Sequence, residues 1–171
     1  LSTDDSLFIQ ADAKISFGEG SFNYYRLLPN RMELIGNIGS SEFIPGFEVA
    51  TPFSPAYIDR RAPFDFIDQF DNEADLSVAV PVEDLPEELI ELAGPLVEAV
   101  DSVRFRTNIE QDEIIDAYGT LVVDGITYDV LREKRTEVRQ LRFDTYNFFV
   151  GWQDVTDLFL ELVNELPGGE D

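Results

Sequence analysis

The sequence predicts a single, mainly β (α+β) domain over residues 1–171: an antiparallel curved sheet, sandwich or open barrel with about two helices packed on it. The main observation is a β-hairpin at 117–138, in which two β-rich runs flank Asp124-Gly125, a dipeptide suited to the positive φ angles of a tight type I′ turn. The second is a pair of apolar stripes at helical spacing. They predict a helical insertion at 84–100 and a C-terminal helix at 155–165.

The N-terminal third is predicted to be antiparallel sheet. Apolar and polar residues alternate from 9 to 17, which is typical of a half-buried strand. A hairpin is expected where 22–28 and 31–35 flank Pro29-Asn30. The residues expected on the buried side of the first strand are Ile9, Ala11, Ala13, Ile15 and Phe17.

Proline and glycine interrupt the aromatic residues of segment 36–70. Prolines at this density lack the N–H donors of an interior ladder, so we expect extended edge segments and loops that hold aromatic side chains against the core. Short strands are expected at 75–81 and 103–109, and an acidic connection then leads to the hairpin. A last strand is expected at 146–152.

Capping residues define where the helices begin. Asp84 is expected to cap the first helix, with Glu87 in the reciprocal position of a capping box. Gly94-Pro95 breaks or kinks that helix, and Asp154 caps the second.

Charge and residue types exclude several classes of function. The 35 Asp and Glu against 12 Lys and Arg give a net charge of −23, which opposes binding to nucleic-acid phosphates and to anionic membranes. Because only Lys14 and Lys134 are lysines, the composition favours the surface of a halophilic protein; the alternative is an acidic mimic of nucleic acid. The chain has no Cys and no His, which removes Ser-His-Asp and Cys-His catalysis, and no run of 18 apolar residues that would span a membrane. We therefore expect no enzyme and no bound cofactor.

One acidic segment is a candidate metal site. Calcium takes six to eight oxygen ligands, and loops rich in carboxylates supply them, although the spacing here matches no EF-hand. The alternative is a solvated acidic loop. The candidate ligands of a calcium ion are Asp68, Asp71, Glu73 and Asp75.

One strand carries five of the twelve cations. Alternation places Arg132, Lys134 and Arg142 on one face as a candidate ligand-binding stripe for an anionic polysaccharide. Arg135 and Arg139 lie on the other face, beside acidic residues of the same strand. The alternative interpretation is a set of cross-strand ion pairs, each contributing about 0.2 to 1 kcal/mol.

Two further functions stay open at this point. A glycoside hydrolase needs only two carboxylates, and Tyr146 with Trp152 would then line a sugar subsite, but sequence alone selects no pair of acids. A lipocalin-like or lipoprotein-carrier-like binder would enclose an apolar ligand in a curved sheet, and the many Phe, Leu and Val residues suit such a cavity.

The hairpin also carries a family resemblance. The motifs Tyr118-Gly-Thr-Leu121 and Leu131-Arg-Glu-Lys-Arg-Thr-Glu137, with the aromatic strand Phe22-Asn-Tyr-Tyr25, stand in the order seen in a family of domains. In this the chain resembles uncharacterised secreted or surface proteins of bacteria that use the gliding-associated type 9 secretion route. The match covers most of residues 20–150, and the two helices are departures from it.

The resemblance implies an exported location: extracellular, periplasmic or at the cell surface, with a signal peptide removed. Its motifs are structural and bring no activity with them. The sequence therefore predicts a non-enzymatic module of an exported or cell-surface bacterial protein, with a structural role or a role in recognising a glycan or a neighbouring protein.

Overall fold

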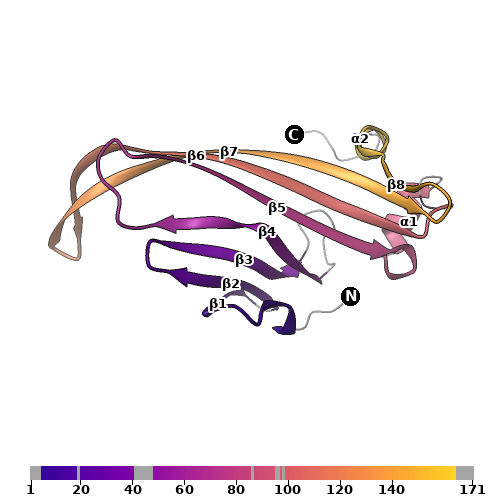
Figure 1. Cartoon of the computed structure of the whole chain (residues 1–171), viewed down its shortest axis with the longest axis horizontal. Helices are drawn as coiled ribbons and strands as arrows, with labels where there is room; N and C mark the ends of the chain where they lie inside the picture. Colours follow the sequence, from indigo (N-terminus) through magenta and orange to yellow (C-terminus); the bar gives the residue numbers. More distant parts are fainter. Residues whose placement is uncertain are drawn as a thin grey trace.

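The computed structural model describes residues 5–18, 20–40, 48–85, 87–94, 97 and 99–164. They form one open, eight-stranded antiparallel sheet in which the strands follow each other in sequence order (Figure 1). The prediction of a mainly β antiparallel fold is confirmed, and the sheet does not close into a barrel. The strands are β1 (Ala13–Gly18), β2 (Ser21–Leu28), β3 (Arg31–Ser40), β4 (Glu48–Arg61), β5 (Gln69–Pro81), β6 (Ser102–Val123), β7 (Ile126–Asn147) and β8 (Gly151–Asp154).

The predicted hairpin is confirmed as β6 and β7. Its turn residues Asp124 and Gly125 both have positive φ, +52° and +79°, as a type I′ turn requires. Each strand has 22 residues: β6 also takes in the predicted strand at 103–109 and the segment that joins it to the hairpin, and β7 continues to Asn147. The acidic stretch expected as a connection before the hairpin lies inside β6, where Gln111 and Glu113 are buried. Polar partners on β4 and β7, which lie far away in the sequence, allow this burial.

β4 corrects the prediction for segment 36–70. Residues 48–61 of that segment are not an edge but a strand near the middle of the sheet, between β3 and β5. Its prolines are tolerated because β4 pairs with β5 only through Phe53, opposite Leu76, so few ladder donors are needed there. β4 therefore joins two halves of the sheet, β1–β3 and β5–β8. Residues 41–47 lie outside the described residues.

The predicted half-buried first strand is wrong in its burial. The 3₁₀ turn η1 (Asp5–Phe8) precedes β1, and Ile9, between the two, is 88% exposed. Ile15 and Phe17 on β1 are exposed as well. β1 is an edge strand, with β2 as its one strand neighbour in the described sheet. Phe8 fills the apolar site instead, because its ring stacks on Tyr24 at a centroid distance of 4.3 Å.

Helical cover is smaller than predicted. In the region 84–100, Asp84 lies in a 3₁₀ turn, η2 (Val82–Asp84), and only α1 (Glu87–Ala93) is α-helical among the described residues. The predicted end of this helix at Pro95 falls outside them. α2 (Thr156–Asn164) is the only α-helix of the described part that is longer than two turns. The predicted cap is present, since the Asp154 carboxylate accepts the Thr156 N–H at 3.0 Å.

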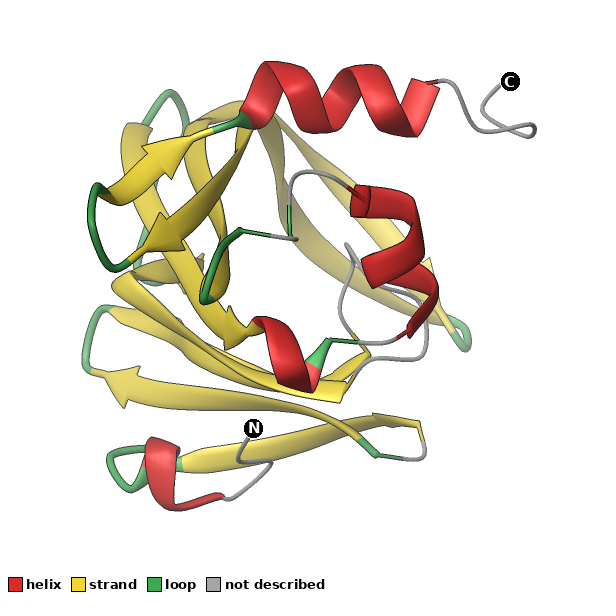
Figure 2. Ribbon diagram, turned by 90° about the vertical axis from the view of Figure 1, so that its right-hand side faces the viewer, coloured by secondary structure: helices red, strands yellow, loops and turns green. Residues whose placement is uncertain are grey.

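The main apolar core lies where the helices meet β5, β6 and β7. Phe143 stacks on Phe159 of α2 at 4.2 Å and meets Phe105 edge-on at 4.9 Å. Figure 2 shows the helices on the open side of the curved sheet. A second, smaller cluster lies on the other half of the sheet. Successive residues of β4, Val49 and Ala50, belong to one cluster each, because side chains alternate between the faces of a strand.

The buried carboxylate of Glu33 makes stability depend on pH. Burial alone raises its pKa, but the hydrogen bonds and charges of Arg31 and Arg26 outweigh that effect and lower the pKa below the ordinary 4.5. Arg31 Nε lies 2.6 Å from Glu33 Oε1, and Arg26 Nε donates to Oε2 at 2.8 Å. A lowered pKa means that this stabilisation is present above pH 4.5 and is lost as the pH falls through the folded-state pKa.

We therefore expect Glu33→Gln to destabilise the chain at neutral pH, with a loss that shrinks as the pH falls below about 4.5. Urea unfolding of both proteins between neutral pH and about pH 3 measures the difference. A difference in unfolding free energy that stays constant with pH would contradict this assignment of the Glu33 charge.

Candidate functional site

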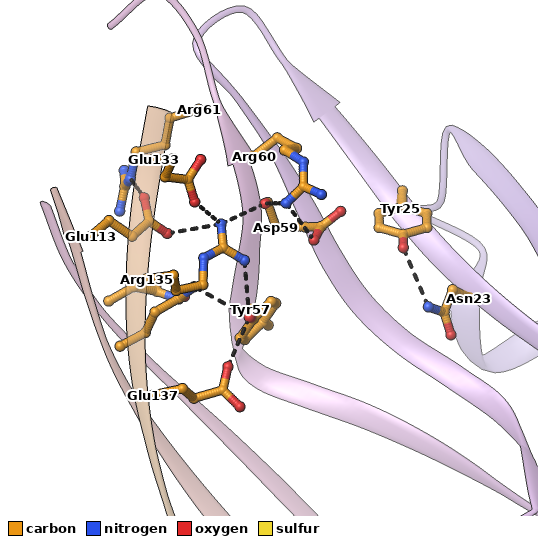
Figure 3. A network of polar contacts seen from close by, with 12 residues as sticks. Asn23, Tyr25, Tyr57, Asp59, Arg60, Arg61, Glu113, Glu133, Arg135 and Glu137 are labelled. Atoms are coloured by element: carbon orange, nitrogen blue, oxygen red, sulfur yellow. Dashed lines mark hydrogen bonds and ion pairs between the residues drawn. The ribbon is translucent and has the colours of Figure 1, made fainter. Parts of the chain in front are cut away.

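A network of polar side chains fills the middle of the inner face, the face of β6 that carries the buried Phe105 and Ile109 (Figure 3). Tyr57 of β4 reaches across to β7, where its hydroxyl donates to Glu137 Oε2 at 2.9 Å. The same hydroxyl accepts from Gln111 Nε2 and from Arg135 Nη1, each at 3.2 Å. We call this set the polar network: Tyr57, Arg61, Gln111, Glu113, Glu133, Arg135 and Glu137.

Glu113 is the buried charge of the polar network. Arg135 Nη2 lies 3.2 Å from Glu113 Oε1, and Arg61 Nε lies 3.5 Å from Oε2. Arg135 also bonds the backbone carbonyl of Asp59 at 2.9 Å and pairs with Glu133 at 2.7 Å. One guanidinium thus ties β4 to β6 and β7, which makes Arg135 the centre of the network.

The pKa values in the network diverge. Burial raises the pKa of Glu113 despite the opposing charge of Arg135. Burial also favours a raised pKa for Glu137, but hydrogen bonds from Arg139 and Tyr57 outweigh it, and the pKa is lowered. Burial and the bond to Glu137 raise the pKa of the Tyr57 hydroxyl. A raised and a lowered carboxyl pKa side by side is a pattern of acid–base catalysis. Here, however, Glu113 is 5% exposed and is held on two sides by arginines, so the arrangement suits a structural polar core.

The predicted calcium ligands are spread along the start of β5. Asp71, Glu73 and Asp75 alternate on the outer face of the strand, whereas Asp68 lies in the preceding turn, where its carboxylate accepts the Asp65 N–H at 2.7 Å. Asn108 donates to both Glu73 and Asp75 at 3.0 Å. Within the described ranges no group of three or more carboxylates is placed to hold a metal ion. Calcium at these residues stays a prediction, which a calcium titration of the folded chain checks.

The predicted ligand-binding stripe does not come together as one cluster. Arg132, Lys134 and Arg142 do share the outer face of β7, opposite to Arg135 and Arg139. Eight residues separate Lys134 from Arg142, about 27 Å along an extended strand. Arg132 pairs with Asp116 across the hairpin, with bonds of 2.8 and 3.0 Å, which agrees with the ion-pair alternative.

Arg142 has two arginine neighbours on β6 that were not predicted from the sequence. It lies directly opposite Arg106 of β6, and Arg104 is one step further along the same face. Both β6 arginines contact the buried carboxylate of Asp144, Arg104 Nε at 2.8 Å and Arg106 Nη2 at 2.7 Å. The sequence shows that Arg104 and Arg106 lie on one face of a strand. It does not show that Arg142, which is far away in the chain, lies beside them.

Arg104 occupies one face of the expected sugar subsite. The guanidinium of Arg104 lies 4.2 Å from the centroid of the Trp152 ring, and Tyr146 lies at 5.2 Å on the same side of the sheet. A cation over one indole face occupies the surface on which a sugar would stack. Trp152 therefore packs against Arg104 of the outer face, with Tyr146 beside it.

The end of the β6–β7 hairpin carries an exposed apolar surface. β5 pairs with β6 only as far as Ile114, so the hairpin continues without a third strand and projects from the sheet (Figure 1). Two cross-strand pairs on its outer face consist of apolar residues that are 47–56% exposed. We call them the tip patch: Leu121 opposite Tyr128, and Val123 opposite Ile126.

Between Ala117 and Val130, no acidic side chain shares the face of the tip patch. The nearest outward residues on that face are Gly119 and Val130, while Asp129 lies on the opposite face and Asp124 lies in the turn. In a chain with 35 acidic residues, an apolar surface without carboxylates stands apart from its surroundings. From the sequence, these residues are recognised only as β-strand formers. Their position on a projecting hairpin depends on where β5 ends.

The structure thus defines an open antiparallel meander with a polar network inside and a projecting hairpin. Comparisons with protein-family models, with curated proteins and with solved structures find no match to this chain. Among the helices of the described ranges, none has the length and apolar character to cross a membrane.

Proposed function

We propose that this chain is a non-enzymatic recognition module of an exported, cell-surface protein, and that the tip patch binds a neighbouring protein. The observation that carries the proposal is the exposure of Leu121, Val123, Ile126 and Tyr128 together on one face of a free-standing hairpin. Exposed contiguous apolar surfaces mark interaction sites in soluble domains.

The partner surface follows from the chemistry around the patch. Tyr128 supplies an aromatic anchor of the kind that dominates the energy of interfaces, with three aliphatic residues beside it. Asp124 and Asp129 flank the patch, and the chain as a whole carries −23 charges. The complementary surface is therefore an apolar groove with a basic rim.

Three other functions have less support. A carrier of apolar ligands needs an apolar interior, whereas Tyr57, Gln111, Glu113 and Arg135 occupy the middle of the inner face. A glycoside hydrolase needs an accessible carboxylic acid with a raised pKa, and Glu113, whose pKa is raised, is buried. A glycan would stack on Trp152, and Arg104 already lies over one face of that ring.

Photo-crosslinking in intact cells of the source organism tests the proposal. We expect a benzophenone side chain at Val123 to give an adduct with one protein. The same group at Ala79, an exposed position in the body of β5, should give none. Equal adducts from both positions, or a carbohydrate adduct from Val123, would contradict a protein partner at the tip patch.

The double variant L121D/Y128D separates recognition from folding. We expect its midpoint of thermal unfolding to stay within about 2 °C of the wild type, because both side chains are about half exposed and lie outside the two apolar clusters. Circular dichroism during heating measures the midpoint. A fall of about 10 °C would show that the patch is part of the folded core instead.

A further inference from the structure

One edge of β7 is without a neighbouring strand over most of its length. β6 covers one side of β7 completely, but β8 pairs with it only from Asp144 to Asn147. Across the described residues, the remaining stretch of the β7 edge up to Phe143 has no strand partner. Such an edge presents a row of unpaired N–H and C=O groups, which is a template for another strand.

Phe143 shows which backbone groups face that edge. Its N–H donates to Thr156 Oγ1 at 2.9 Å, and its C=O accepts the Val155 N–H at 2.9 Å; both partners follow β8. Backbone groups alternate in direction along a strand, so every second residue before Phe143 also points its N–H and C=O to the free edge. These residues are Leu131, Glu133, Arg135, Glu137, Arg139 and Leu141.

We propose that this edge pairs antiparallel with the same edge of a second copy of the chain, about a two-fold axis at Thr136. A two-fold contact uses the same patch on both copies, so the sequence around the axis must complement itself. It does so here: in this register Arg135 faces Glu137, Glu133 faces Arg139, and Leu131 faces Leu141 of the other copy. No two like charges lie opposite each other between 131 and 141.

Neighbouring registers lack this complementarity. An axis at Arg135 or at Glu137 places a charge directly opposite its own copy. An axis at Lys134 does the same, and an axis at Val138 places Lys134 opposite Arg142. Like charges directly opposite each other destabilise a strand pair. Thr136 is therefore the one centre between 134 and 138 that avoids them.

The local charge of the edge allows two acidic chains to approach. Residues 131–141 hold four cations and two carboxylates, a local charge of +2 in a chain of −23. The excess negative charge lies on other parts of the chain, where about 0.5 M salt screens it within a few ångströms. Both the charges and the unpaired backbone groups of this edge therefore favour pairing with a second copy.

A charge-swap cycle tests the register. In about 0.5 M NaCl we expect the wild type to sediment as a concentration-dependent dimer. R139E places Glu opposite Glu133, and E133R places Arg opposite Arg139, twice in each dimer. Each single variant should raise the dissociation constant about tenfold, and the double variant E133R/R139E should restore it. R60E on β4, which makes the same change in charge as R139E, and L121D/Y128D at the tip should leave the dissociation constant unchanged.

Hydrogen exchange in the dimer provides the second readout. We expect added protection at the amides of the edge-facing residues from 131 to 141. A wild type that is monomeric up to millimolar concentration, or a double variant weaker than both single variants, would overturn the proposal. A dimer with its protection at residues 118–128 would also overturn it, because the tip and not the edge would then join the copies.

Discussion

Replacing Arg135 by Met is expected to destabilise the fold by about 3 kcal/mol, because it leaves the buried carboxylate of Glu113 without its nearest cation. The same change removes the bonds of Arg135 to the Tyr57 hydroxyl and to the Asp59 carbonyl, which hold β4 against β7. Chemical denaturation measures the loss as a shift of the midpoint at an unchanged slope.

Arg132, three residues earlier on the same strand, is the matched control. Its pair with Asp116 is solvent-exposed, with 68% of the arginine side chain accessible, so R132M should destabilise the fold far less than R135M. Replacing both buried partners, as in E113M/R135M, should recover most of the loss, because no buried charge then remains unpaired. Equal losses for R132M and R135M would show that burial of Glu113 is not the cause.

Replacing Gly36 by Ala is expected to cost about 3 kcal/mol for a steric reason. A Cβ at this position would lie 2.1 Å from Cε1 of Phe8 and 2.8 Å from the backbone oxygen of Thr51. The Phe8 ring would have to leave its stack on Tyr24, and the β3–β4 ladder would have to shift as well. The small apolar cluster of the N-terminal half would lose its central contact.

Gly119 in the projecting hairpin is the control for Gly36. A Cβ there meets no atom within 4 Å, so Gly119→Ala should be neutral or slightly stabilising. Thermal unfolding of both variants compares the two sites directly. A destabilisation of G119A as large as that of G36A would mean that the hairpin packs against something in solution.

The hairpins could be predicted from sequence because their signals are local. Asp124-Gly125 determines the turn by its own φ preferences, and strand formers on both sides continue the ladder. The role of β4 was hidden, because prolines usually mark an edge and here lie in a middle strand with little pairing to β5. The burial of Ile9 was predicted wrongly because alternation shows which residues share a side but not whether another element covers that side, and Ile9 lies before β1.

The site required contacts between distant residues. Tyr57 and Glu137 are separated by 80 positions, and they meet because the long side chains of β4 and β7 reach each other across the inner face of the curved sheet. A list of acids and arginines cannot show which of them pair, so Glu113 was not selected from the sequence. The tip patch was hidden for another reason. Its residues are ordinary strand formers, and their exposure follows from the end of β5 at its pairing with Ile114.

Competition for the adduct formed at Val123 tests the recognition role of the tip patch most directly. Excess soluble wild-type chain should suppress the adduct in cells, because it occupies the same partner surface through its own tip patch. The L121D/Y128D chain, folded to the same midpoint, should leave the adduct in full yield. Equal suppression by both chains would contradict the account, since the partner would then bind a surface other than the tip patch.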